Sequence, residues 1–354
     1  MSNTRIDQIT FTRFIAAIAV VVFHFGLNTT PFNNELISFL FKEANVGVSY
    51  FFLLSGFVMV VAYIDKPKLN LFGYYKARFF RIYPVYFIAL LLVLLYFVEK
   101  NRTIDSIGLG MNLLVIQAWF PGKALTLNFP GWSLAVEFFF YAIYPFLFNA
   151  LYKKRDIKSL VLPILLFWII SQYALYAIVS SSFYQGYPSK SYEFAYYFPF
   201  MHLNQFLIGN LAALFFHKYK KKSGNYDIAV IVVFVLIVAA LKYPLGLIYH
   251  NGLLALLFIP FILLLSFNQG VISSLFRKKF FCYLGDISYS IYILQVPVYM
   301  WIDELFKYFR INDALMQFYV SLVMLILFSA LTFSFIDVPL REKIKRVSIK
   351  NNQR

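Results

Sequence analysis

The chain has 354 residues, of which 61% are hydrophobic, 21% aromatic and 14% charged. This composition excludes an ordinary soluble domain and indicates a polytopic membrane protein. The single cysteine, Cys282, excludes an intrachain disulfide, and no residue spacing suggests a metal site. The formal net charge of +16 suggests nucleic-acid binding as one function, but its interpretation depends on where the Lys and Arg residues lie relative to the membrane spans.

Hydropathy predicts an all-α protein with about ten spans, near residues 10–28, 46–64, 82–98, 132–150, 160–180, 199–217, 226–241, 247–267, 283–301 and 315–336. With the N-terminus in the cytoplasm, 24 of the 32 Lys and Arg residues fall in inside segments and 8 in outside segments. This asymmetry favours ten spans with both termini cytoplasmic. The charge is then mostly topogenic, with attraction to anionic lipid second and no nucleic-acid partner. We expect one membrane domain, 1–354, without an additional extracellular domain.

The first span contains two ionisable residues, Arg13 and His24. An Arg at a helix centre costs roughly 2.5–3.5 kcal/mol on insertion scales, so both residues suggest function. Eleven helical steps separate them by ~16 Å and return to within about 20° of one face, which predicts shared neighbours. Asp7 in the preceding segment and the absence of a small-residue cleavage site argue against a signal peptide.

Two further segments can contribute to a site. The apolar run 107–120 is short for a ~30 Å hydrocarbon core, so we predict a re-entrant or interfacial element that lies over a site. In the second span, Ser55 and Gly56 indicate close helix packing or, alternatively, the lining of a substrate path.

The cationic segment before the third span holds Arg78 and Arg81, which share a helical face at i and i+3. Guanidinium groups so placed can bind phosphate, although fixing topology explains them equally well. Pro84 suits the first turn of that span.

Glu137 lies in the outer part of the fourth span, on one face with Tyr141 and Tyr144. His24 is expected at similar depth, which makes Glu137 the more plausible direct neighbour of His24 than Arg13. The remaining histidines (His202, His217, His250) are more typical of interfacial positions than of catalysis. The tyrosines of the loop 181–198 indicate an aromatic belt or, alternatively, a surface on which sugars stack.

A buried histidine with a carboxylate can remove a proton from an alcohol, and inner-face arginines suit a nucleotide-containing thioester. Together they predict acyl transfer from a cytoplasmic donor to an acceptor on the other side. A proton-coupled transporter or flippase is the alternative, because intramembrane ionisable residues also mark proton paths. It lacks support from detectable repeats.

Six segments in order resemble the acyltransferase-3 family of membrane O-acyltransferases, from about Ile6 to Pro339: RIDQITFTRFIAAIAVVVFH, GVSYFFLLSGF, RFFRIYP, GWSLAVEFFFYAIYP, LGDISYSIYILQVP and IDVP. The resemblance implies transfer of an acyl group, commonly acetyl, from acyl-CoA to a hydroxyl of a surface or lipid-linked carbohydrate such as O-antigen. It implies a bacterial inner-membrane location, acyl-CoA as co-substrate and no bound cofactor.

The resemblance also assigns roles to residues. His24 would be the catalytic base, Arg13 a donor or active-site contact, and Glu137 the carboxylate of the Trp-Ser-Leu motif. Arg78 and Arg81 would bind acyl-CoA. The predicted substrate path comprises Ser55, Trp132, Ser133, Tyr141, Tyr289 and Gln295. Many relatives have His where this chain has Gln295. Some relatives carry an extracellular hydrolase-like domain, so this chain would deliver the acyl group directly or through a separate protein.

Overall fold

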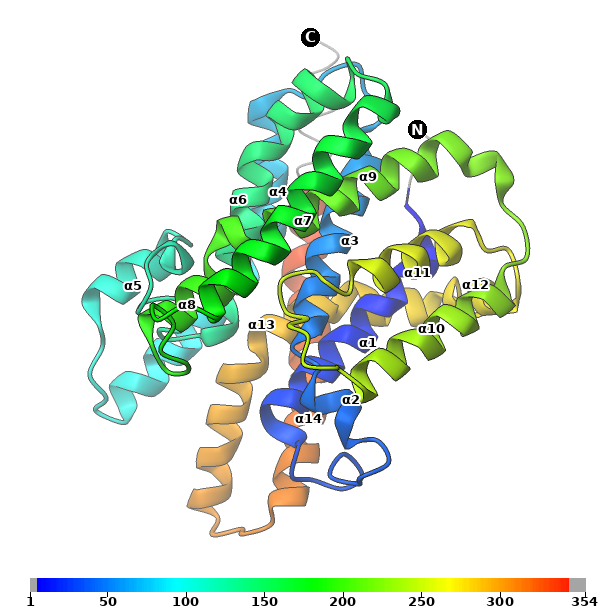
Figure 1. Cartoon of the computed structure of the whole chain (residues 1–354). Coiled ribbons are helices and arrows are strands. Elements are labelled where there is room, and N and C mark those ends of the chain that lie inside the picture. Colours follow the sequence, from blue (N-terminus) through cyan, green and yellow to red (C-terminus); the bar gives the residue numbers. More distant parts are fainter. Residues whose placement is uncertain (1–4, 344–354) are drawn as a thin grey trace.

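The computed structural model describes residues 5–343, and that part of the chain contains helices and no strands (Figure 1). The first half comprises η1 (Asp7–Ile9), α1 (Thr10–Val21), η2 (Val22–Gly26), α2 (Ser38–Lys42), α3 (Val46–Tyr63), α4 (Leu71–Glu99), α5 (Ser106–Leu113), η3 (Gln117–Trp119), η4 (Phe129–Gly131), α6 (Trp132–Leu147) and η5 (Phe148–Tyr152). The second half comprises α7 (Ile157–Val179), α8 (Lys190–Tyr197), η6 (Pro199–His202), α9 (Leu203–Tyr219), η7 (Lys220–Lys222), α10 (Asp227–Lys242), α11 (Ala255–Phe267), α12 (Val271–Phe276), α13 (Lys279–Tyr308), α14 (Ala314–Thr332) and η8 (Phe333–Asp337).

Six helical segments of the described chain are long and apolar enough to cross a membrane: Asp7–Gly26, Val46–Tyr63, Leu71–Glu99, Phe129–Tyr152, Ile157–Val179 and Ala314–Lys343. At three other predicted spans, α9, α10 and α11 have 17, 16 and 13 residues, fewer than the ~20 that a straight span needs. The long helix α13 carries many polar residues. Helix class and multiple apolar helices are therefore confirmed, and the count of ten spans stays a prediction.

The start of the third span was predicted wrongly. Helix α4 begins at Leu71 because the side chain of Asn70 accepts a hydrogen bond from the backbone N–H of Gly73 at 3.1 Å and caps the helix. Pro84 therefore lies inside α4 and not in its first turn. As a result, Arg78 and Arg81 belong to the same helix as the apolar segment that follows them.

Helices α3 and α9 approach closely at a pair of glycines. A Cβ atom on Gly56 would lie 2.2 Å from the carbonyl oxygen of Phe206, and one on Gly209 would lie 2.0 Å from that of Leu53. No larger residue fits either position without separation of the helices. The packing interpretation of the Ser55-Gly56 pair is thus correct for Gly56.

The segment between α4 and α6 forms the short element expected there. The eight-residue helix α5 is too short to cross a bilayer. Three fully buried amide side chains of this segment donate to backbone carbonyls: Asn112 to that of Gly108, Gln117 to that of Gly131, and Asn128 to that of Ile293. Hydrogen bonds within the protein thus satisfy many polar groups of this irregular segment, as is required where non-helical chain lies at membrane depth.

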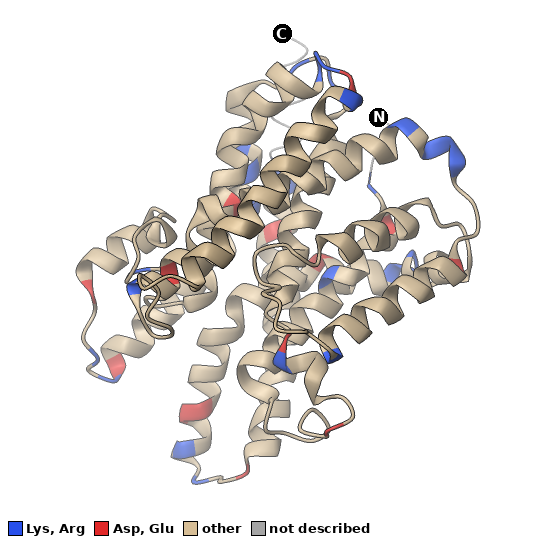
Figure 2. Cartoon of the chain, in the orientation of Figure 1, with Lys and Arg blue, Asp and Glu red and all other residues tan. Residues whose placement is uncertain are grey.

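The beginning of α1 and the end of η8 lie at the same end of the bundle (Figure 1). Lys and Arg residues gather at this end, including the turn after η5 and the segment after α9 (Figure 2). The cavities described next open among residues from this end of the chain's first and last helices.

Candidate active site

Two adjoining cavities lie between α1, α3, α4 and α13. The larger, of about 370 Å³, is lined by five arginines and one carboxylate together with apolar residues: Arg5, Arg13, Arg78, Arg81, Arg341 and Asp286. The smaller, of about 80 Å³, shares Arg13, Arg78 and Arg81 with it and reaches toward the first turns of α6. A site so rich in guanidinium groups is suited to an anionic ligand.

Most of the predicted site residues meet in the smaller cavity. Its lining includes Arg13, Ser55, Arg78, Arg81, Ser133, Glu137, Tyr141 and Tyr289. These residues come from five helices and are far apart in sequence. His24, Trp132 and Gln295 do not line either cavity.

The arginines of the smaller cavity differ in their surroundings. Arg78 donates to the hydroxyl of Tyr63 at 2.8 Å and lies over the rings of Tyr63, Tyr74 and Tyr141. Within residues 5–343, neither Arg13 nor Arg81 forms a hydrogen bond or ion pair. The tyrosines therefore hold Arg78 in place, whereas Arg13 and Arg81 keep their donors for a ligand.

Glu137 is positioned by two hydroxyl groups. Ser55 donates to its Oε1 at 3.2 Å, and the hydroxyl of Tyr141, one turn later in α6, donates to the same oxygen. Both arginines without protein partners line a small adjacent cavity with this carboxylate. Ser55 thus lines the predicted path while its neighbour Gly56 packs.

His24 is held through one ring nitrogen. Its Nδ1 lies 2.8 Å from Oε1 of Gln295, whose Nε2 donates to the carbonyl of Tyr292 at 2.6 Å. Because that donation fixes which end of the amide faces the ring, Nδ1–H must be the donor to Gln295. In the described chain no residue hydrogen-bonds Nε2, so this nitrogen keeps its lone pair available as a base.

The predicted pairing of His24 with Glu137 is wrong, because the two side chains bind different partners. The prediction that Arg13 and His24 face the same neighbours is also wrong. His24 lies in the π-helical turn η2, whose wider turn departs from the 100° per residue on which that prediction relied. Arg13 therefore lines the arginine-rich cavities, while His24 faces Gln295 and the ring of Phe129, 4.8 Å away between centroids.

Trp132 lies in an aromatic cluster and lines none of the three cavities, so its place on the substrate path stays a prediction. Its ring packs against Tyr197, His202 and His250, with centroids 4.7, 5.3 and 5.6 Å away. Both histidines hydrogen-bond the carbonyl oxygen of Tyr196 through Nε2. His202 and His250 are thus buried among aromatic rings and hydrogen-bonded to backbone, and not at an interfacial position as predicted.

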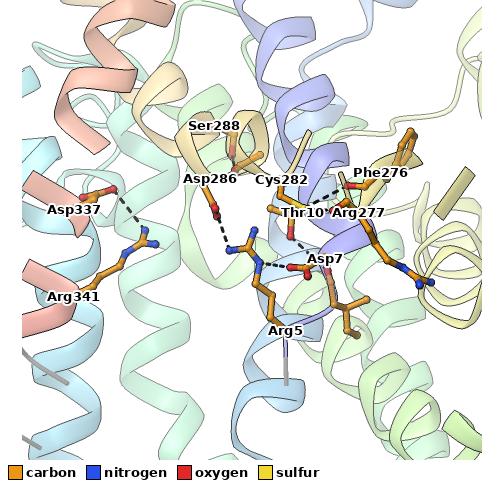
Figure 3. Close-up of polar contacts among 12 residues, drawn as sticks. Arg5, Asp7, Thr10, Phe276, Arg277, Cys282, Asp286, Ser288, Asp337 and Arg341 are labelled. Atoms are coloured by element: carbon orange, nitrogen blue, oxygen red, sulfur yellow. Dashed lines mark hydrogen bonds and ion pairs between the residues drawn. The ribbon is translucent and has the colours of Figure 1, made fainter. Parts of the chain in front are cut away.

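Sequence reasoning missed the rim of the larger cavity, shown in Figure 3. Arg5 bridges Asp7 and Asp286, with Nε–Oδ1 and Nη1–Oδ2 distances of 2.8 and 3.1 Å. Arg341 lies 3.6 Å from Oδ2 of Asp337. Both arginines look topogenic in sequence, because they flank the first and last spans, and no local pattern links them.

Comparison with known families decides the relationship that the six motifs suggest. Residues 6–336 match the family described as "Acyltransferase domain", the acyltransferase-3 family. The chain belongs to this family. Its apolar helices agree with a membrane protein.

Relatives of this chain are named for O-acetyl or acyl transfer. It is 29% identical to the acyltransferase MdmB of Streptomyces mycarofaciens over 59% of this chain and 57% of that protein. It is 22% identical to the peptidoglycan O-acetyltransferase OatA of Listeria monocytogenes and 24% identical to the O-acetyltransferase OatA of Staphylococcus aureus, over 96% and 94% of this chain and 56% of each relative. The chain thus spans a little over half the length of these curated relatives. No solved structure matches it.

Proposed function

We propose that this acyltransferase moves an acyl group, most simply acetyl, from cytoplasmic acyl-CoA to a hydroxyl of a surface or lipid-linked carbohydrate. One observation carries the proposal. Helix α1 brings Arg13 into an arginine-lined cavity and continues into η2, where Gln295 holds the ring of His24 with Nε2 uncommitted. The names of the OatA relatives support O-acetylation of a cell-wall or other surface glycan.

Residues at the two ends of the α1–η2 segment would have different roles in the reaction. Arg13 and Arg81 would bind the donor end, and Arg78, held by tyrosines, would add positive charge beside them. His24 would accept the proton of the acceptor hydroxyl as its oxygen attacks the thioester carbonyl, and the thiolate of CoA would leave. Glu137, bound by Ser55 and Tyr141, would place a negative charge beside Arg13 and Arg81 in the same small cavity.

The test is acetyl transfer by purified protein in nanodiscs, with acetyl-CoA and candidate glycan acceptors. We expect His24→Ala to reduce turnover at least 100-fold at equal protein amount, since general-base catalysis contributes about 10²–10⁴. His217→Ala is the matched control, because His217 is 38% exposed and lies 4.0 Å from Asp65 at the surface. An active His24→Ala variant would remove histidine from the mechanism.

A deletion strain tests the transporter alternative. Mass spectrometry of its surface glycans should show loss of an acetyl increment with the polymer retained. Loss of the whole polymer would instead favour an export function.

A further inference from the structure

The rim of the larger cavity is formed by arginines from both ends of the described chain. Arg5 precedes η1 and Arg341 follows η8, and both line the cavity that continues to Arg13 and Arg81. Each rim arginine faces a carboxylate: Arg5 faces Asp286, and Arg341 faces Asp337 (Figure 3). Each guanidinium group at the cavity rim therefore has a carboxylate beside it and still has N–H donors that a ligand can bind.

The pair of Arg341 and Asp337 is incomplete. Its 3.6 Å separation is too long for a hydrogen bond. Asp337 is 1% exposed, and its Oδ1 and the Nε of Arg341 are both buried without a hydrogen-bond partner in the described residues. Buried polar groups are normally satisfied, so the unpartnered Nε–H of Arg341 is a donor that an acceptor atom of a ligand can complete.

The ligand's charge follows from the lining. Five arginines and a single carboxylate, Asp286, face the larger cavity. An anion with several acceptor oxygens would bind guanidinium groups bidentately and compete with the carboxylates that now hold them. Phosphate has this chemistry, whereas a neutral sugar or a cation does not.

We propose that Arg5 and Arg341 form a phosphate subsite for the nucleotide part of the acyl donor, in which the phosphates replace Asp286 and Asp337 as partners of the two guanidinium groups when the donor binds. The inference rests on the proposed function and assigns the donor's orientation. The larger cavity, about 370 Å³, falls in the range of small-molecule sites, whereas the smaller, about 80 Å³, suits only the acyl-thioester end. The thioester therefore points inward past Arg13 and Arg81, toward Ser133 and Tyr292 at the end of the smaller cavity, and the phosphates stay at the rim.

The experiment compares two donors in nanodiscs of phosphatidylcholine. Acetyl-CoA carries the nucleotide phosphates, and S-acetylpantetheine lacks them. We expect Arg341→Gln and Arg5→Gln each to raise KM for acetyl-CoA about tenfold or more, with kcat nearly unchanged, as loss of charge-assisted hydrogen bonds predicts. KM for S-acetylpantetheine should not change.

Arg277→Gln is the matched control. Arg277 bonds the carbonyl of Asn268 and the side chain of Gln269 and lines neither cavity, so its loss should leave KM for both donors unchanged. Arg341→Lys retains the charge and should recover part of the acetyl-CoA affinity. Thermal melting of each purified variant confirms that folded protein is compared.

Three outcomes would overturn the assignment. An equal rise in KM for both donors would show a structural effect. Unchanged KM for acetyl-CoA would exclude the rim arginines from donor binding while leaving the proposed function intact. An effect seen only in nanodiscs containing anionic lipid would identify a lipid headgroup as the phosphate ligand. If the wild type failed to use acetyl-CoA with any acceptor, the proposed function would fall with the inference.

Discussion

Replacement of Gln295 by Met tests whether this side chain sets the state of His24. Met has nearly the volume of Gln but offers His24 no amide oxygen. The structure shows one bond to Nδ1 at 2.8 Å, and Gln295 is fully buried, so no water replaces it readily. Loss of the partner leaves the buried N–H unsatisfied and permits the tautomer in which Nε2 carries the proton.

The expected magnitude follows from one buried neutral hydrogen bond. A net contribution of about 0.5–1.5 kcal/mol, rising to about 1–3 kcal/mol when a buried donor is left unpaired, corresponds to roughly a 10- to 100-fold fall in kcat. KM for the acyl donor should change little, because Gln295 does not line the arginine-rich cavities. Gln295→His, which restores a ring nitrogen as acceptor, should recover part of the activity.

The assay follows the release of CoA with a thiol reagent, in nanodiscs supplied with acetyl-CoA and acceptor glycan. Gln205→Met is the matched control: Gln205 is also fully buried, and its Nε2 lies 3.1 Å from Nδ1 of His202, outside the cavities. It should lose thermal stability but keep kcat per folded molecule. Wild-type kcat in Gln295→Met would refute the positioning role.

Two other changes probe the scaffold. Gly56→Ala should lower the free energy of unfolding by about 1–3 kcal/mol, because its Cβ would lie 2.2 Å from the carbonyl oxygen of Phe206. Gly110→Ala is the control, because a Cβ there has no atom within 4 Å. Thermal melting compares the two variants, and equal melting temperatures would contradict the close packing at Gly56. The ammonium group of Lys123, 2.5 Å away, lowers the pKa of Asp105, so this ion pair stabilises the loop above the ordinary carboxyl pKa and is lost as pH falls through the lowered value. The protection factors of the amides at 105–126, corrected for the intrinsic pH dependence of exchange, should fall on acidification in the wild type, and Asp105→Asn should abolish that fall.

The local features of the fold follow from sequence more reliably than their contacts. Hydropathy predicted a span at 46–64, and α3 occupies Val46–Tyr63. It placed the start of the third span too late, because hydropathy does not detect the cap at Asn70 or recognise that Arg78 and Arg81 can face a cavity while remaining in a helix. Helix length and capping, not apolarity alone, set that boundary.

For the candidate site, too, the sequence identified residues more reliably than the contacts between them. The motifs identified Arg13, Arg81 and Glu137, which the structure brings to one small cavity. The partner of His24 was not predictable from local pattern, because Gln295 is 271 residues away and the π-helical turn changes the direction of the ring. The rim arginines had no signal beyond charge, which topology also explains.

The arrangement of α13 against α1 explains how one span carries two costly residues. The helices touch backbone to backbone at Gly285, where a Cβ would lie 2.1 Å from the carbonyl oxygen of Thr10. From this contact α13 presents Asp286 to Arg5 at one end and Gln295 to His24 further along. A single helix thus holds groups at the donor rim and at the proposed base. A change in the α1–α13 contact should therefore disturb both the Arg5–Asp286 pair and the His24–Gln295 bond, which would couple the proposed donor rim to the proposed base.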